Sequence, residues 1–138
     1  MKASYVFAAA AACLATTANA GTTKFDLACE GSSDVLNGSV KTATPFSRTF
    51  HLDLESSKYC IDDCKTIIDL ARVDPLLITL IDVPRHGNAF NMSMVKQTID
   101  RRTGELATFD FDAAKLRSVS EKAICIPKPF TPFPETKF

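Results

Sequence analysis

Residues 90–111, FNMSMVKQTIDRRTGELATFDF, decide the fold class of this chain. Apolar and polar side chains alternate along both halves of the segment, which is typical of half-buried β-strands. The alternation changes phase at Met94-Val95, and such a slip predicts a β-bulge. Gly104 follows Arg102-Thr103 and can supply the left-handed residue of a type I turn with a G1 bulge. We therefore predict a long β-hairpin with its tip at residues 102–104.

The most regular alternation lies upstream, in residues 46–56, FSRTFHLDLES. A strand with this pattern has one apolar and one polar face. The apolar face is expected to carry Phe46, Phe50, Leu52 and Leu54. The polar face is expected to carry Ser47, Thr49, His51, Asp53 and Glu55, which makes His51 an ordinary exposed histidine. Arg48 falls on the apolar face and is expected at the rim of the strand.

Shorter strand patterns flank these two segments. They are KFDLAC (24–29), KTIIDLARV (65–73), LLITLIDV (76–83) and EKAICI (121–126). Pro75 and Pro84 argue against a continuous helix there. Residues 30–45 are polar and rich in turn formers, so we expect the most flexible internal loop, and residues 112–120 are expected to form a helical turn or a loop. Six or seven antiparallel strands without a clear helix predict an all-β fold, a small antiparallel barrel or sandwich.

The first twenty residues resemble a secretory signal peptide. Lys2 precedes an apolar stretch from Tyr5 to Ala15, and small residues end the segment at Ala18-Asn19-Ala20. Cleavage after Ala20 makes Gly21 the first mature residue. The apolar stretch is shorter than the roughly 20 residues that span a bilayer, and no later segment is more apolar, so we expect no integral membrane span.

Cys13 raises the alternative of a lipoprotein signal, in which the chain is cut before a cysteine that is then acylated. A large aliphatic residue usually stands three positions before such a cysteine, but this chain has Ala10 there. We therefore expect no lipid anchor at Cys13, and a periplasmic or secreted product.

Four cysteines follow the signal segment, namely Cys29, Cys60, Cys64 and Cys125. An even number in an exported chain indicates disulfides. Cys60 and Cys64 can bond only if the chain turns, because an extended five-residue segment would hold their Cα atoms about 13 Å apart. Asp62-Asp63 are suitable turn residues. We predict Cys60–Cys64, which leaves Cys29 to pair with Cys125. The C-x3-C spacing does not suit a zinc ribbon.

The chain ends in CIPKPFTPFPETKF (125–138). Four prolines exclude a helix or a central strand, and three phenylalanines are too apolar for a solvated tail. We predict one β domain in residues 21–126 and an extended segment in 127–138 that packs on the fold through Phe130, Phe133 and Phe138. The alternative is a strip that binds a partner through its P-x-x-P pattern.

Charge and side-chain chemistry exclude several functions. Sixteen basic and sixteen acidic residues balance, so no nucleic-acid partner is indicated. Only His51 and His86 can act as near-neutral bases, and no G-x-S-x-G motif accompanies them. Two pairs of nearby acids, Asp62 with Asp63 and Asp110 with Asp112, are expected to be solvated. We expect neither enzymatic activity nor a cofactor. An acidic zone of Asp53, Glu55, Asp62 and Asp63 leaves cation binding open, without EF-hand spacing.

Four motifs resemble a group of small exported proteins of alphaproteobacteria without an assigned activity. They are FDLACEG (25–31), YCIDDC (59–64), IDRRTGEL (99–106) and the ending CIPKPFTPFPETKF. The chain is also loosely similar to periplasmic inhibitors of c-type lysozyme, which are small β-barrels that join an early and a late cysteine. Their Ser-Gly-x-x-Tyr and Thr-Lys-Gly segments do not occur here, so the similarity implies the barrel but not the inhibition.

Two function classes follow. The first is an inhibitor-like β domain that binds an unidentified envelope macromolecule. The second is a carrier that holds a small apolar ligand in a β-barrel. We favour the first, because ten phenylalanines suit a dry packed core at least as well as a cavity.

Overall fold

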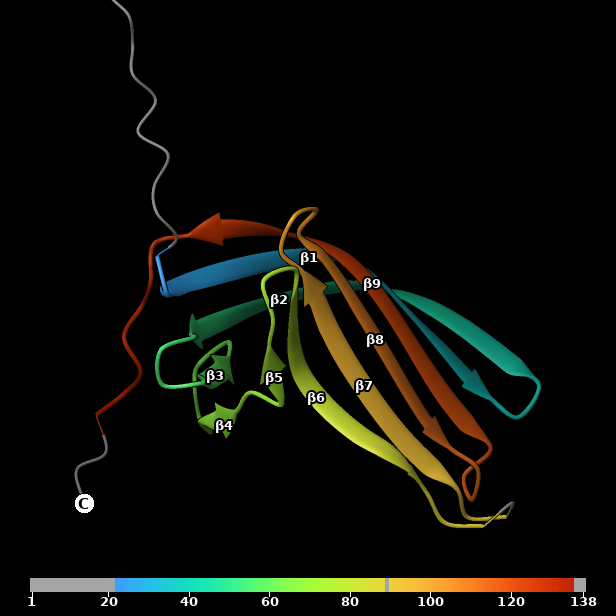
Figure 1. The fold of residues 1–138 in the computed structure, drawn as a ribbon. Coiled ribbons are helices and arrows are strands. Elements are labelled where there is room, and N and C mark those ends of the chain that lie inside the picture. The colour runs from blue at the N-terminus through green and yellow to red at the C-terminus, as the bar shows by residue number, and fades with distance from the viewer. Residues whose placement is uncertain (1–21, 89, 136–138) are drawn as a thin grey trace, which may run out of the picture.

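The computed structural model describes residues 22–88 and 90–135. They form one antiparallel sheet of nine strands that curls into a half-barrel (Figure 1). The described residues contain no helix, and so none that could cross a membrane. The all-β prediction is confirmed, and the sheet is a curled single layer rather than a sandwich. The segment 1–20 with Cys13, the mature terminus Gly21 and Phe138 lie outside the described residues.

The strand count of six or seven was too low. The strands are β1 (Lys24–Asn37), β2 (Val40–Asp53), β3 (Lys58–Ile61), β4 (Ile68–Asp69), β5 (Arg72–Val73), β6 (Leu77–His86), β7 (Ser93–Asp100), β8 (Glu105–Asp112) and β9 (Arg117–Lys128). Their order in the sheet is β4-β3-β2-β1-β9-β8-β7-β6-β5. Residues 65–73 were expected to form one strand, but they contain two strands of two residues each, β4 and β5, and this division raises the count.

The two edges of the sheet meet at one end of the molecule. β4 and β5 are the edge strands, yet only Leu70 and Ala71 separate them in the chain. Leu70 N–H donates to the Ser57 carbonyl at 2.9 Å, and Ala71 N–H to the Leu80 carbonyl at 3.4 Å. This is the closed end of the half-barrel, and it holds the core. Buried core side chains include Leu27, Phe50, Leu52, Tyr59, Ile78, Leu80, Ile99 and Leu106.

The strand predicted in residues 46–56 is present as the second half of β2, but it ends at Asp53, and residues 54–56 lie in the turn that follows. Phe46, Phe50 and Leu52 are buried as expected. Arg48 shares their face and is half-buried, with its guanidinium carbon 4.9 Å from the centroid of the Phe46 ring. A cation over an aromatic face is electrostatically favourable, which explains how the arginine is tolerated beside the core.

Residues 30–45 were predicted to be a flexible loop, and this is wrong. β1 pairs with β2 without interruption from Lys24↔Asp53 to Asn37↔Val40. Gly38 has a φ of 58° and is the first residue of the two-residue turn, where a type II′ turn requires a positive φ. The segment lies beyond the core, so neither face needs apolar residues. The segment is therefore a regular hairpin whose polar composition shows no hydrophobic alternation in the sequence.

The hairpin predicted in residues 90–111 forms between β7 and β8, and Gly104 has the expected positive φ of 72°. The predicted bulge at Met94-Val95 is wrong, because β7 and β8 pair without a break. The extra residues lie in β6 instead, between Thr79 and Ile81 and between Val83 and His86. The second irregularity contains Pro84, whose missing N–H is compatible with an interrupted ladder.

The C-terminal segment was predicted to leave the sheet at Pro127, but β9 continues to Lys128. β9 pairs with β8 only as far as Ile124, but with β1 as far as Lys128. Pro127 therefore lies in a stretch of β9 with a single neighbour, where a strand tolerates proline. Beyond it, Phe130 and Phe133 are half-buried and pack edge to face with centroids 5.6 Å apart.

Candidate functional site

Both predicted disulfides are present, and both stabilise the closed half. Cys29 and Cys125 are directly opposed in the β1–β9 register, with their Cα atoms 3.9 Å apart. Cys60 and Cys64 have a Cα–Cα distance of 5.0 Å across the predicted turn. Asp62 has a φ of 51°, the left-handed conformation that aspartate tolerates better than most residues.

His51 was expected to be exposed, and this is wrong: only 7% of its surface is accessible. It does lie on the outer face of β2, but the turn at Asp62 and the C-terminal tail cover it. Its Nε2 donates to the Asp62 carbonyl oxygen at 2.9 Å. Its Nδ1 lies 2.9 Å from Asp26 Oδ1, an ion-pair distance without the alignment of a regular hydrogen bond.

Asp26 joins this histidine to the tail, and sequence reasoning missed it. Its carboxylate accepts the Thr131 hydroxyl at 2.7 Å and the Thr131 N–H at 3.1 Å. The only signal was its position on the polar face of β1, since Asp26 opposes His51 in the register. Asp26 and His51 are both buried on this face, and the described contacts place no nucleophile on the histidine. We call this group the tail clasp and assign it a structural role.

The acidic zone does not converge on one point. Lys24 Nζ lies 3.1 Å from Asp53 and 3.7 Å from Glu55, so these two acids share a cation. Asp62 accepts the Thr49 N–H at 2.8 Å, and Asp63 pairs with Lys65 at 3.0 Å. Across the described ranges, no three His, Cys, Asp or Glu residues are arranged to hold a metal ion.

The remaining sequence candidates lie at the opposite end of the sheet, which we call the open end. His86 is exposed and its Nε2 lies 3.0 Å from Ser93 Oγ. Asp110 and Asp112 are not free acids, because Arg117 lies 3.5 Å from the first and Lys115 lies 2.8 Å from the second. The two acids are therefore ion-paired, and His86 and Ser93 form a hydrogen-bonded pair at the exposed surface.

Three chain connections meet at the open end (Figure 1). Gly38 N–H, in the β1–β2 turn, donates to the Leu116 carbonyl of the β8–β9 turn at 2.7 Å. Ala113 N–H of that second turn donates to the Met92 carbonyl of the β6–β7 connection at 2.8 Å. The three connections therefore form one continuous hydrogen-bonded rim.

A large apolar side chain is exposed in two of these connections and directly after the third, at the start of β2. Phe90 is 87% exposed, Leu116 is 70% exposed and Val40 is 65% exposed. Phe90 was expected on a strand face, but it lies in a turn where Asn88 Oδ1 accepts its N–H at 2.9 Å. The sequence signal for this turn was Gly87-Asn88, because both residues favour turns.

A second group of apolar side chains lies on the outer face of the sheet, next to the rim. Leu106 of β8 points into the core, so Phe109 and Phe111 point outward because side chains alternate. Met94 of β7 directly opposes Phe111. Phe109 is exposed, whereas Phe111 and Met94 are half-buried. We define the open-end surface as Val40, Phe90, Met94, Phe109, Phe111 and Leu116.

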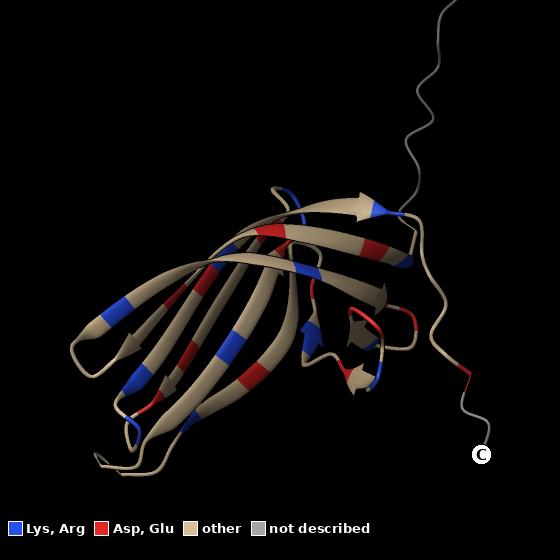
Figure 2. Ribbon diagram, turned by 180° about the vertical axis from the view of Figure 1, so that it is seen from behind, with Lys and Arg blue, Asp and Glu red and all other residues tan. Residues whose placement is uncertain are grey.

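Paired charges border the open-end surface. Lys41 lies 3.1 Å from Asp34, next to Val40, and Lys115 lies beside Leu116. Figure 2 shows basic and acidic positions interspersed along the strands. An apolar centre with a polar border is typical of protein interfaces, whereas binding to a polyanion requires an excess of basic charge.

Comparison of the chain with family models, curated proteins and solved structures finds no match. Its function is therefore inferred from the chemistry of its surfaces.

Proposed function

We propose that this chain is an exported domain that binds an envelope macromolecule through the open-end surface. The observation that carries the proposal is the rim itself: three connections are joined by hydrogen bonds, and each has an exposed large apolar side chain in it or directly next to it. Exposed apolar residues gathered at one place on a small domain, rather than scattered singly, mark a binding surface.

Two turns of the rim are short and hydrogen-bonded, so binding of a partner would cost little conformational entropy. The β1–β2 turn has two residues, and the β8–β9 turn is held by Leu116 N–H donating to the Ala113 carbonyl at 3.1 Å. Short hydrogen-bonded turns are ordered before a partner arrives, so less conformational freedom is lost on association. A rigid apolar edge is suited to inhibitor-like insertion into a partner's surface.

Two disulfides indicate an oxidising compartment outside the cytoplasm. Secretion or periplasmic residence is the finer part of the proposal, and it rests on the signal-like segment 1–20. Recovery of a chain that begins at Gly21 from the periplasm or medium would support it. A lipid-modified terminus at Cys13 would contradict it.

The binding test compares three forms of the oxidised protein immobilised on a resin: the natural chain, Phe90→Ser with Leu116→Ser, and Ile126→Ser. Ile126 is a matched control, because it is 63% exposed but lies on β9 near the closed end. Substitutions at such exposed positions change folding stability by about 0.5 kcal/mol or less. We expect the double variant, but not the control, to lose a component retained from envelope extract. Equal retention by all three forms would overturn the proposal.

The alternative of a carrier with a ligand inside the barrel has less support. The interior of the closed half is filled by fully buried side chains such as Phe50, Leu52 and Tyr59. A small ligand would have to bind at the end of this packed interior rather than within it.

A further inference from the structure

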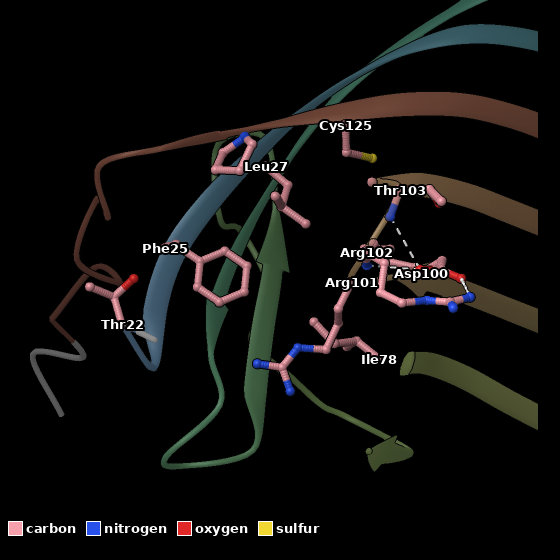
Figure 3. Close-up of a pocket in the computed structure, with 12 residues that line it drawn as sticks. Thr22, Phe25, Leu27, Ile78, Asp100, Arg101, Arg102, Thr103 and Cys125 are labelled. Atoms are coloured by element: carbon pink, nitrogen blue, oxygen red, sulfur yellow. Dashed lines mark hydrogen bonds and ion pairs between the residues drawn. The ribbon is translucent and has the colours of Figure 1, made fainter. Parts of the chain in front are cut away.

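A cavity of about 370 Å³ opens at the closed end, away from the open-end surface. It lies between the start of β1, the end of β9 and the tip of the β7–β8 hairpin (Figure 3). Its apolar wall consists of Phe25, Leu27, Ile78, Ile99, Cys125 and Pro127. Small-ligand sites are cavities of about 300–1,000 Å³ with mostly apolar walls and a few polar groups, and this cavity is near the lower limit.

The hairpin tip that borders the cavity is anchored on two sides. Cys125 N–H donates to the Gly104 carbonyl at 2.8 Å, and Arg101 N–H donates to the Leu76 carbonyl at 2.9 Å. A Cβ at Gly104 would lie 2.6 Å from the Cys125 carbonyl oxygen, so only glycine allows this approach. The Cys29–Cys125 disulfide further fixes the wall. The cavity is therefore preformed, which lowers the cost of binding.

The tip carries two arginines with different partners. Arg102 Nη2 lies 3.3 Å from Asp100 Oδ2. Asp100 also accepts the N–H groups of Arg102 and Thr103, and these interactions, above all the hydrogen bond from the Arg102 backbone, hold the Asp100 pKa below its ordinary value of 3.8. Asp100 is thus an ionised carboxylate that is hydrogen-bonded within its own turn and ion-paired with Arg102.

Arg101 has no such counter-ion. Its Nη1 donates to the Asp74 carbonyl at 3.1 Å, and no Asp or Glu of the described residues lies within 4.0 Å of its guanidinium nitrogens. In Figure 3 the Arg101 side chain extends toward Phe25 and Ile78, whereas Arg102 points away from them to Asp100. A positive charge with free donors therefore stands beside an apolar wall.

We propose that this cavity binds a small amphiphilic carboxylate, with its alkyl chain against the apolar wall and its carboxylate on the Arg101 guanidinium. The planar guanidinium fork matches a carboxylate and can donate two parallel hydrogen bonds. The chain buries against Phe25, Ile78 and Ile99, and the volume limits it to short or medium length. This site is independent of the open-end surface and of the macromolecule that binds there.

The test is an NMR titration of the oxidised, ¹⁵N-labelled protein with sodium octanoate and, separately, with octanol. Octanoate is expected to shift the amides around Phe25 and residues 101–104 in a saturable way. Arg101→Gln is expected to weaken octanoate binding at least about tenfold, because hydrogen bonds to charged groups contribute about 1.5–3 kcal/mol. Octanol is expected to bind the natural chain and Arg101→Gln equally.

Arg102→Gln is the matched control, because it removes the same charge from the same tip. Its charge is already engaged by Asp100, so we expect a change of less than about threefold. Arg101→Lys keeps the positive charge but lacks the planar guanidinium. This variant should bind octanoate with an affinity between those of the natural chain and Arg101→Gln. The dispersion of the amide chemical shifts in the spectrum of each variant shows whether that variant is folded. Equal weakening by Arg101→Gln and Arg102→Gln, or shifts confined to the open-end surface, would overturn the assignment.

Discussion

Tyr59 is the only tyrosine after residue 20, and its ring is fully buried beside Leu52. Burial disfavours the charged phenolate and raises the Tyr59 pKa above its ordinary value of 10.0. The neutral ring therefore contributes stability below about pH 10, and this stability is lost as the pH rises further.

An alkaline titration of the mature chain, followed by tyrosinate absorbance, tests this burial directly. We expect the folded chain to titrate above pH 10.0 and the chain in denaturant to titrate at the ordinary value. Circular dichroism in parallel shows whether the fold is intact. A midpoint near 10.0 in a chain that is still folded would contradict the burial of Tyr59.

His51 and Arg48 show where residue-scale reasoning succeeds and where it fails. Alternation along β2 correctly assigned each of them to a face, because that assignment depends only on the pleat. It could not show that His51 is buried, because the covering residues Asp62 and Thr131 are distant in sequence. The open-end surface was missed for the same reason, since hydrogen bonds between separate turns create it.

At the scale of elements, the C-terminal tail gives the clearest prediction. A chain that ends at Lys128 loses the half-buried rings of Phe130 and Phe133, each contributing about 1 kcal/mol. It also loses the Thr131 contacts with Asp26. We expect the truncated chain to melt about 8 °C or more below the full chain, because the two rings together contribute about 2 kcal/mol and 1 kcal/mol corresponds to about 4 °C in a domain of this size.

Thr131→Val measures the contribution of the tail clasp to stability apart from that of the phenylalanine rings. It removes the hydroxyl that donates to Asp26 and keeps the shape of the side chain. It should lower the melting temperature less than truncation does. A truncated chain with the melting temperature of the full chain would show that the tail contributes no stability. If that chain had also lost a partner, the tail would be a recognition strip.

Elements with a strong alternating pattern were predictable, and those defined by long-range pairing were not. The β7–β8 hairpin and its Gly104 turn follow from local signals. β4 and β5 exist only because the edges of the curled sheet meet around Leu70, which no short window of sequence shows. The polar halves of β1 and β2 escaped detection because hydrophobic periodicity reports burial and not hydrogen bonding.

At the scale of the whole molecule, the two disulfides should differ in their contribution to stability. The Cys29–Cys125 bridge closes a loop with a sequence separation of 96, and the Cys60–Cys64 bridge a loop with a separation of 4. Chain-entropy estimates assign about 4–5 kcal/mol to the long loop and about 2 kcal/mol to the short one. Denaturant unfolding of the two paired Cys→Ala variants is expected to show the larger loss for Cys29 and Cys125. Equal losses would contradict this order.

The molecule thus has a rigid closed half with a small cavity and an open half whose rim exposes apolar side chains. We propose that the open-end surface binds a macromolecule. The most direct test of this proposal is site-specific photo-crosslinking in envelope extract, with a benzophenone side chain placed at position 90 in one protein and at position 126 in another. We predict a discrete macromolecular adduct from position 90 and none from position 126. No adduct from position 90, or the same adduct from both positions, would contradict the claim.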